Sequence, residues 1–66
     1  MRLEIEIQGK EVNIYNNGNL WVGGQNTGLR QWESNPKIWE NQSGQQIIDL
    51  KGMSLEEVLK FKGYIR

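Results

Sequence analysis

The 66-residue chain contains no cysteine, no histidine and no alanine, and it has a single proline. Without cysteine there are no disulfides and no thiolate ligands for a metal. The lack of histidine removes the commonest metal ligand and the usual general base near neutral pH. We therefore expect no cofactor and no metal, and a fold held together by side-chain packing or by self-association.

The chain also has no excess of positive or negative charge, because 8 Lys and Arg residues balance 8 Asp and Glu residues. Proteins that bind nucleic acid through many phosphates are normally basic, so nucleic acid is a less favoured partner than protein. No apolar run approaches the roughly 20 residues of a membrane span. Residues 1–6 alternate charged and apolar side chains, unlike a signal peptide. We expect no membrane contact and, by default, a cytoplasmic protein.

A chain of this length predicts one domain over residues 1–66, because domains typically need roughly 50–200 residues. At this size folding buries only about 60% of the surface of the unfolded chain. The core is therefore expected to be small, and the few large side chains should carry much of the packing.

Apolar and polar residues alternate over residues 2–8 and again over residues 11–15, which is typical of strands with one dry face and one wet face. Gly9-Lys10 between them predicts a two-residue hairpin turn. The Asn17-Gly18 pair is the strongest turn signal, since Asn-Gly suits a type I′ turn. A third strand is predicted over residues 20–24.

The middle of the chain is open to two interpretations. Two strands, residues 29–33 and 37–41, can flank a loop that contains Pro36. Alternatively, Asn35 is the N-cap of a short helical turn with Pro36 at the first helical position. We favour strands, because Trp and Ile are common in sheets.

Glycines between residues 23 and 28 predict a bulge or loop, and residues 42–45 predict a further turn. The short apolar segment at residues 46–50 is then expected to be another strand.

The C-terminal segment predicts a helix over residues 54–62. Ser54 and Glu57 have the spacing of a capping box, and Gly63 is a typical residue just after a helix end. A helix this short needs a sheet to pack on. The sequence therefore predicts an α+β fold, in which a small meander-like antiparallel sheet of about five short strands is packed by one C-terminal helix.

Residues for catalysis are scarce. The serines have no histidine to activate them, and Ser54 already has a capping role. Glu33 and Glu40 can face each other across a hairpin, but we interpret them as solvated surface charges. We expect no catalytic residue and therefore no enzyme.

Three tryptophans in 66 residues are a high content. Trp39 and Trp32 are candidates for the core, whereas the phase of Trp21 opposes that of Leu20 and Val22 and predicts a surface position. No charged residue occurs from residue 13 to residue 29. We predict a contact surface with Trp21 and Tyr15 as anchors, and with Asn17, Asn19, Gln25, Asn26, Arg30 and Trp32 around them.

This composition favours a non-enzymatic interaction module that binds another protein, of the adaptor or inhibitor type, with a homo-oligomer also possible. The alternative is binding of single-stranded nucleic acid, with Trp21, Trp32 and Arg30 stacking on bases. A third hypothesis is carbohydrate binding, in which sugar rings stack on aromatic side chains and hydrogen-bond to the amides.

Overall fold

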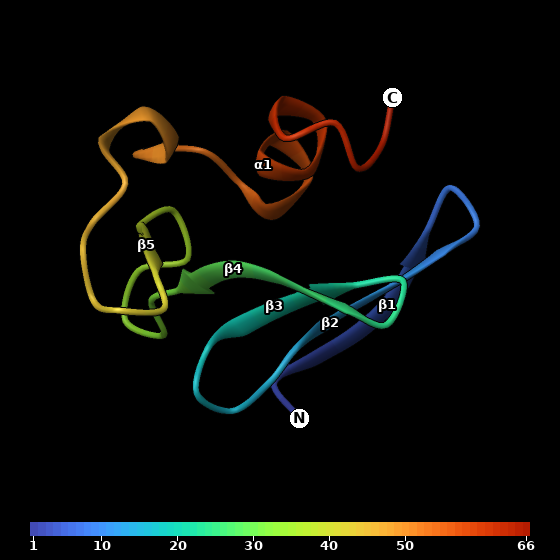
Figure 1. Cartoon of the computed structure of the whole chain (residues 1–66), viewed down its shortest axis with the longest axis horizontal. Helices are drawn as coiled ribbons and strands as arrows, with labels where there is room; N and C mark the ends of the chain where they lie inside the picture. Colours follow the sequence, from blue (N-terminus) through green and yellow to red (C-terminus); the bar gives the residue numbers. More distant parts are fainter.

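In the computed structural model, which describes residues 1–66, five antiparallel strands lie side by side in chain order, so the sheet is an open meander. A 3₁₀ turn, η1 (Ile48–Leu50), and one helix, α1 (Leu55–Phe61), follow the last strand (Figure 1). The predicted fold class is therefore confirmed. The strands are β1 (Leu3–Ile7), β2 (Lys10–Ile14), β3 (Asn19–Val22), β4 (Gln25–Gln31) and β5 (Trp39–Asn41).

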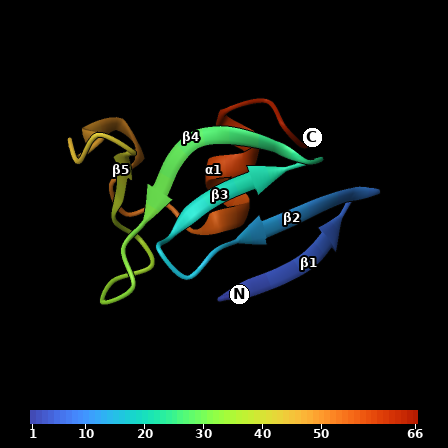
Figure 2. The ribbon, with the colours of Figure 1, turned by 60° about the horizontal axis from the view of Figure 1, so that its bottom comes forward.

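The core lies between one face of the sheet and α1. Seen from the other face, α1 lies behind the sheet (Figure 2). Alternate residues of the strands point toward the helix, as the period of two requires, and α1 contributes its own apolar side. The buried apolar side chains are Val12, Ile14, Leu20, Val22, Leu29, Trp39, Leu50, Val58, Leu59 and Ile65.

Of the two core candidates among the tryptophans, only Trp39 is buried. Its side chain has no exposed surface, and its indole Nε1 donates a hydrogen bond to the Met53 carbonyl at 2.9 Å. The prediction was wrong for Trp32, which is 39% exposed. Trp32 lies one residue beyond β4, where its side chain alternates away from buried Gln31.

The first hairpin turns one residue earlier than predicted. Gln8 and Gly9, with φ angles of 51° and 78°, form the turn, and Lys10 already pairs with Ile7. Both central residues have a positive φ, as in a type I′ turn. Glycine is therefore needed at the second central position here, not at the first.

The second turn is not the type I′ turn that the Asn-Gly pair predicts. The Gly18 amide donates to the Tyr15 carbonyl at 2.8 Å, and Gly18 has a φ of 91°. Asn17 does not have a positive φ, so a type I turn is followed by a left-handed glycine. Gly18 is buried, and the Tyr15 amide donates to the Asn19 carbonyl at 3.0 Å to open β3.

Residues 25–28 belong to a strand and not to a loop. Gly23 and Gly24, with φ angles of 59° and 79°, make a tight turn directly after Val22, and β4 starts at Gln25. The bulge predicted in this segment does occur, because the register between β3 and β4 shifts and Gly28 has a φ of 81°.

Between β4 and β5 both interpretations hold in part. The Asn35 side chain accepts a hydrogen bond from the Lys37 amide at 3.1 Å, and its carbonyl accepts one from Ile38 at 3.0 Å. This turn does not continue as a helix. The chain instead enters β5, which is shorter than predicted and begins at Trp39.

The strand predicted for residues 46–50 is wrong. Only Gln46 forms a β-bridge, to Glu40, and the chain then turns into η1. Ile48 is 68% exposed, whereas Leu50 is buried. The 3₁₀ turn directs Leu50 into the core, and it does so without requiring that Ile47 and Ile48 are both covered.

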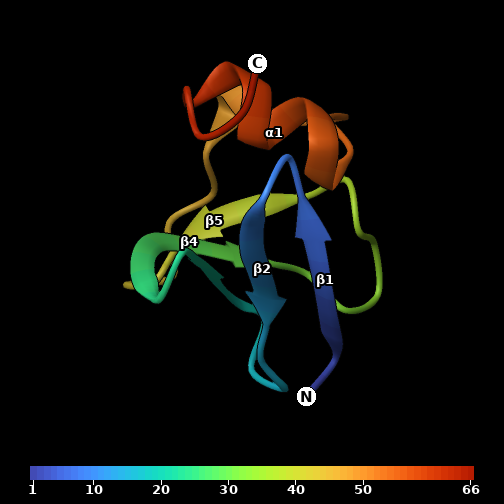
Figure 3. The same cartoon turned by 90° about the vertical axis from the view of Figure 1, so that its right-hand side faces the viewer.

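The helix has the predicted ends. The Glu57 amide donates to the Ser54 hydroxyl, the Ser54 amide donates to the Glu57 carboxylate, and Gly63 has a φ of 83°. After the helix the chain returns to the first hairpin, where the Gln8 side chain exchanges two hydrogen bonds with the Arg66 backbone. Figure 3 shows α1 above the turn that joins β1 and β2.

Candidate binding face

The face of the sheet opposite α1 carries no helix (Figure 2). A row of three uncharged side chains crosses its middle, because Asn13 of β2 pairs with Trp21 of β3, which pairs with Asn26 of β4. Asn13 and Trp21 alternate with core residues along β2 and β3. The segment without charges therefore forms a continuous neutral area on this face.

Trp21 is the largest side chain of this area. It is half-buried, whereas its neighbours Leu20 and Val22 point into the core and are 0% and 6% exposed. Tyr15 packs edge-on against the indole, with ring centroids 5.8 Å apart and an angle of 75° between the rings. The edge-to-face arrangement restricts both side chains, so the indole is held in place on this surface.

The amides around Trp21 are only partly satisfied. Asn13 is 5% exposed and donates from Nδ2 to the Glu11 carboxylate at 2.7 Å, but its Oδ1 has no hydrogen-bond partner. The Oδ1 of Asn19 is likewise buried without a partner. Asn26 is exposed and forms a reciprocal pair of amide hydrogen bonds with Gln42, at 2.9 and 2.6 Å. The two oxygens without a partner are buried, so the exposed amide pair of Asn26 and Gln42 is the part of this group that an incoming polar partner can contact.

The structure brings most of the predicted contact residues to this face, but not all to one spot. Arg30 lies on the same face opposite Asn19. Gln25 lies beside the β3–β4 turn and is exposed. Asn17 belongs to the β2–β3 turn, where its Oδ1 accepts from the Asn19 amide at 3.0 Å. Trp32 lies with Asn17 and Arg30 around a hollow at the end of the sheet.

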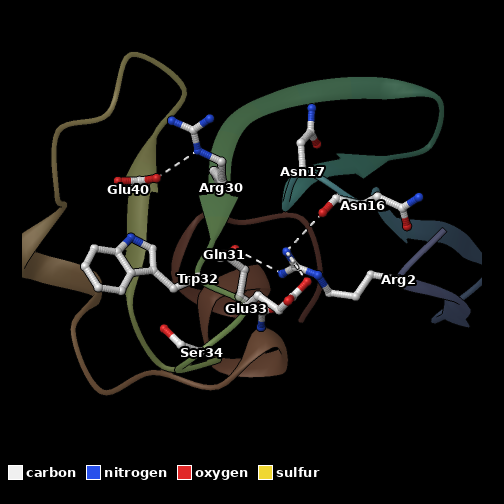
Figure 4. Close-up of a pocket in the computed structure, with 9 residues that line it drawn as sticks. All are labelled: Arg2, Asn16, Asn17, Arg30, Gln31, Trp32, Glu33, Ser34 and Glu40. Atoms are coloured by element: carbon white, nitrogen blue, oxygen red, sulfur yellow. Dashed lines mark hydrogen bonds and ion pairs between the residues drawn. The ribbon is translucent and has the colours of Figure 1, made fainter.

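This hollow has a volume of about 760 Å³ and is open to solvent. Arg2 reaches across it from the start of the chain and donates to the Gln31 carbonyl at 3.0 Å and to the Asn16 carbonyl at 3.3 Å (Figure 4). The lining side chains are polar apart from one aromatic ring. They are Arg2, Asn16, Asn17, Arg30, Gln31, Trp32, Glu33, Ser34 and Glu40.

Each guanidinium of the hollow has a carboxylate close by. Arg30 Nε lies 2.8 Å from Glu40 Oε1, and Arg2 Nη2 lies 3.8 Å from Glu33 Oε2. Glu33 and Glu40, which the sequence places across a hairpin, thus each lie nearest to an arginine. The charges of the hollow cancel, so it suits a neutral polar group better than a phosphate.

Several of these lining residues, Arg2 foremost, were not predicted from the sequence. Its contact with Gln31 joins residues 29 positions apart, and it exists only because the β2–β3 turn and the end of β4 lie together. A lone arginine at the chain start carries no local signal for such a contact.

The residues of the face do not form a metal centre. No group of three or more Asp or Glu side chains converges anywhere in the structure. The only helix of the fold is seven residues long, too short to cross a bilayer.

Comparison with known proteins gives no match to a family model, to a curated protein or to a solved structure.

Proposed function

We propose that this domain is a non-enzymatic protein-binding module, of the adaptor or inhibitor type, and that its partner covers the helix-free face around Trp21. The observation that carries the proposal is the position of this indole, held by Tyr15 in the middle of an uncharged area. Aromatic anchors within a polar rim are typical of protein interfaces.

Two physical properties of the face support a protein as the occupant. The Tyr15–Trp21 contact already restricts the anchor, so binding costs little additional side-chain entropy. The cross-strand neighbours of Trp21 are the amides Asn13 and Asn26 and not charged residues, so covering this row avoids the large desolvation cost of a buried ion. A second copy of the chain is one such protein, because a face of this kind can pair with itself about a two-fold axis.

Replacement of Trp21 by alanine tests this proposal. Proteins retained by the immobilised chain are identified and purified, and their dissociation constants are measured by calorimetry with the wild type and with Trp21→Ala. We expect a loss of affinity of about 30-fold, which corresponds to a hot spot of roughly 2 kcal/mol. The thermal midpoint should change little, because Trp21 points away from the core.

Phe61→Ala is the matched control, since Phe61 is 59% exposed on α1, on the other side of the sheet. It should leave the dissociation constant unchanged. Sedimentation of the wild type over a range of concentrations reports whether the partner is a second copy. A partner that binds Trp21→Ala as tightly as the wild type, or an unfolded Trp21→Ala variant, contradicts the proposal.

Single-stranded nucleic acid is the second candidate, and one observation favours it. Trp32 is 39% exposed and shares the hollow with the guanidiniums of Arg30 and Arg2. Nucleic-acid binding at this hollow requires that a fluorescein-labelled oligo-dT binds with an affinity that falls steeply between about 50 mM and 200 mM salt. Because a carboxylate lies beside each arginine, the protein-binding proposal predicts instead that the oligo-dT does not bind. Quenching of tryptophan fluorescence by oligosaccharides tests carbohydrate binding on the same sample.

A further inference from the structure

The two edges of the sheet are treated differently by the rest of the chain. The outer edge of β5 is covered, because the Asn41 amide donates to Gln45 at 2.8 Å and the Ile47 amide donates to Trp39 at 2.9 Å. The opposite edge of the sheet is β1, which pairs with β2 on one side and with no strand on its other side. The C-terminal Arg66 forms hydrogen bonds with Gln8, in the turn after β1, and not with the strand backbone. The side of β1 away from β2 is therefore open.

The direction of the open backbone groups follows from the next ladder. The Glu11 carbonyl accepts from Gly23, and the Tyr15 amide donates to Asn19, so the odd-numbered residues of β2 bond to β3. The even-numbered residues of β2 then bond to β1, where they lie opposite residues 3, 5 and 7. By the same alternation, the N–H and C=O groups of Glu4 and Glu6 point outward, about 7 Å apart along the strand.

The side chains at this edge have opposite character on the two faces. Glu4 and Glu6 are exposed on the helix-free face, with Glu11 directly across from Glu6, and none of the three forms an ion pair. On the helix side Ile5 is 36% exposed. The cations next to the two ends of β1 in the hairpin bond elsewhere: Arg2 donates to the carbonyls of the hollow, and Lys10 donates to the Tyr64 carbonyl.

We propose that β1 accepts a sixth strand, an extended peptide segment in which Lys or Arg alternates with aliphatic residues. The outward groups of Glu4 and Glu6 supply the main-chain hydrogen bonds of strand addition. The basic side chains lie beside the glutamates, and the aliphatic ones extend the surface of Ile5. A second copy of the chain does not fit, because β1 against β1 sets glutamates beside glutamates, and like charges opposite each other destabilise a sheet.

This inference is separate from the proposed function, because β2 lies between β1 and the strand that carries Trp21. Loss of binding in Trp21→Ala alone concerns the proposed function, and loss in a β1 variant alone concerns the edge.

The probe is a fluorescein-labelled peptide of alternating lysine and valine, and its counterpart carries glutamate in place of lysine. Fluorescence anisotropy against the full chain should show binding of the lysine peptide and at least about tenfold weaker binding of the glutamate peptide. On addition of the lysine peptide, the amides of Glu4 and Glu6 should become protected from hydrogen exchange, while those of Ile5 and Ile7 should change little because β2 already holds them.

Two variants separate charge from strand addition. Glu6→Lys should weaken binding of the lysine peptide about tenfold, and Asp49→Lys, the matched reversal at an exposed site on η1, should weaken it far less. Glu6→Pro removes an outward N–H and none that bonds to β2, so it should abolish binding with the fold retained.

Several outcomes overturn the proposal: equal binding of both peptides, equal effects of Glu6→Lys and Asp49→Lys, or no protection of the Glu4 and Glu6 amides. Protection that grows with the concentration of the chain alone shows instead that the occupant is a second copy, and it overturns the proposal as well. If Glu6→Pro does not fold, the exchange measurement on the wild type still decides.

Discussion

The three tryptophans lie at three depths, and each therefore has a different consequence when it is changed. Trp39 is fully buried and links the sheet to the chain before α1 through Met53. Trp21 is half-buried on the outer face, and Trp32 is exposed at the hollow. Replacing Trp39 removes both packing and a hydrogen bond, whereas the other two contribute more surface for contact than core volume.

Gly18 is the residue at which the chain tolerates a side chain least. A Cβ there would lie 2.4 Å from the Gln31 carbonyl oxygen and 2.9 Å from Arg30 Cγ, in a backbone with a φ of 91°. We expect the backbone strain in Gly18→Ala to lower the free energy of unfolding by about 1–3 kcal/mol. The clash of the new Cβ with β4 should lower it further. Urea denaturation measures the change.

Gly44→Ala is its control, because Gly44 has a φ of 99° but no atom within 4 Å of the added Cβ. This variant carries the strain alone. The difference between the two variants therefore measures the close approach of Gly18 to β4, and equal effects in both would show that the approach is not important. The Arg2 side chain, 3.3 Å from the same Cβ position, links this glycine to the hollow.

At the scale of single elements, α1 is stabilised more by its capping residues than by its length. Seven residues are too few for a helix that is stable by itself, so the capping box and the burial of Val58 and Leu59 must hold it. Hydrogen bonds from the Ser54 amide and hydroxyl lower the pKa of Glu57 from its ordinary value of 4.5, and Lys37 and Lys60 lower it further. The ionised carboxylate is thus part of the cap.

This capping arrangement predicts an acid sensitivity. Because the pKa of Glu57 is lower in the folded than in the unfolded chain, its contribution to stability is complete above pH 4.5 and is lost as the pH falls through the folded value. Glu57→Gln keeps an oxygen for the cap but does not titrate. The difference in unfolding free energy between wild type and Glu57→Gln should therefore shrink below about pH 4.5.

Thermal denaturation followed by circular dichroism, repeated from neutral to acid pH, measures this difference. Glu56→Gln is the matched control on the same helix turn, since Glu56 pairs only with Lys60, at 3.6 Å on the surface. A difference for Glu57→Gln that stays constant with pH would show that the carboxylate does not contribute to the cap.

At the scale of the whole molecule, the fold is a single sheet with one covered face and one open face. The core is small because only α1 and the segment before it cover the sheet. Because no further element covers them, the outer face with its aromatic pair and the edge of β1 with its backbone groups are free to contact other molecules. The outer face is the proposed protein-binding surface, and the edge of β1 is the proposed site of strand addition.

The local sequence by itself determined the elements whose signals lie within a few residues. The alternation over residues 2–8 predicted β1, the Ser54–Glu57 spacing predicted the helix start, and the phase of Trp21 placed it opposite the core. The alternation of side chains along a strand and the spacing of a capping box involve residues only one to four positions apart. Both patterns can therefore be recognised in the sequence without knowledge of the fold.

Only the tertiary structure decided features that depend on residues far apart. The sequence could not show that Trp32 is exposed while Trp39 is buried, because Trp39 is covered by residues distant in the chain, such as Met53, whose carbonyl accepts the indole hydrogen bond. It could not place Arg2 beside Gln31, or show that residues 45–47 cover β5 and leave β1 open. Burial and edge pairing are set by which segments meet in space, and that depends on the packing of the whole chain.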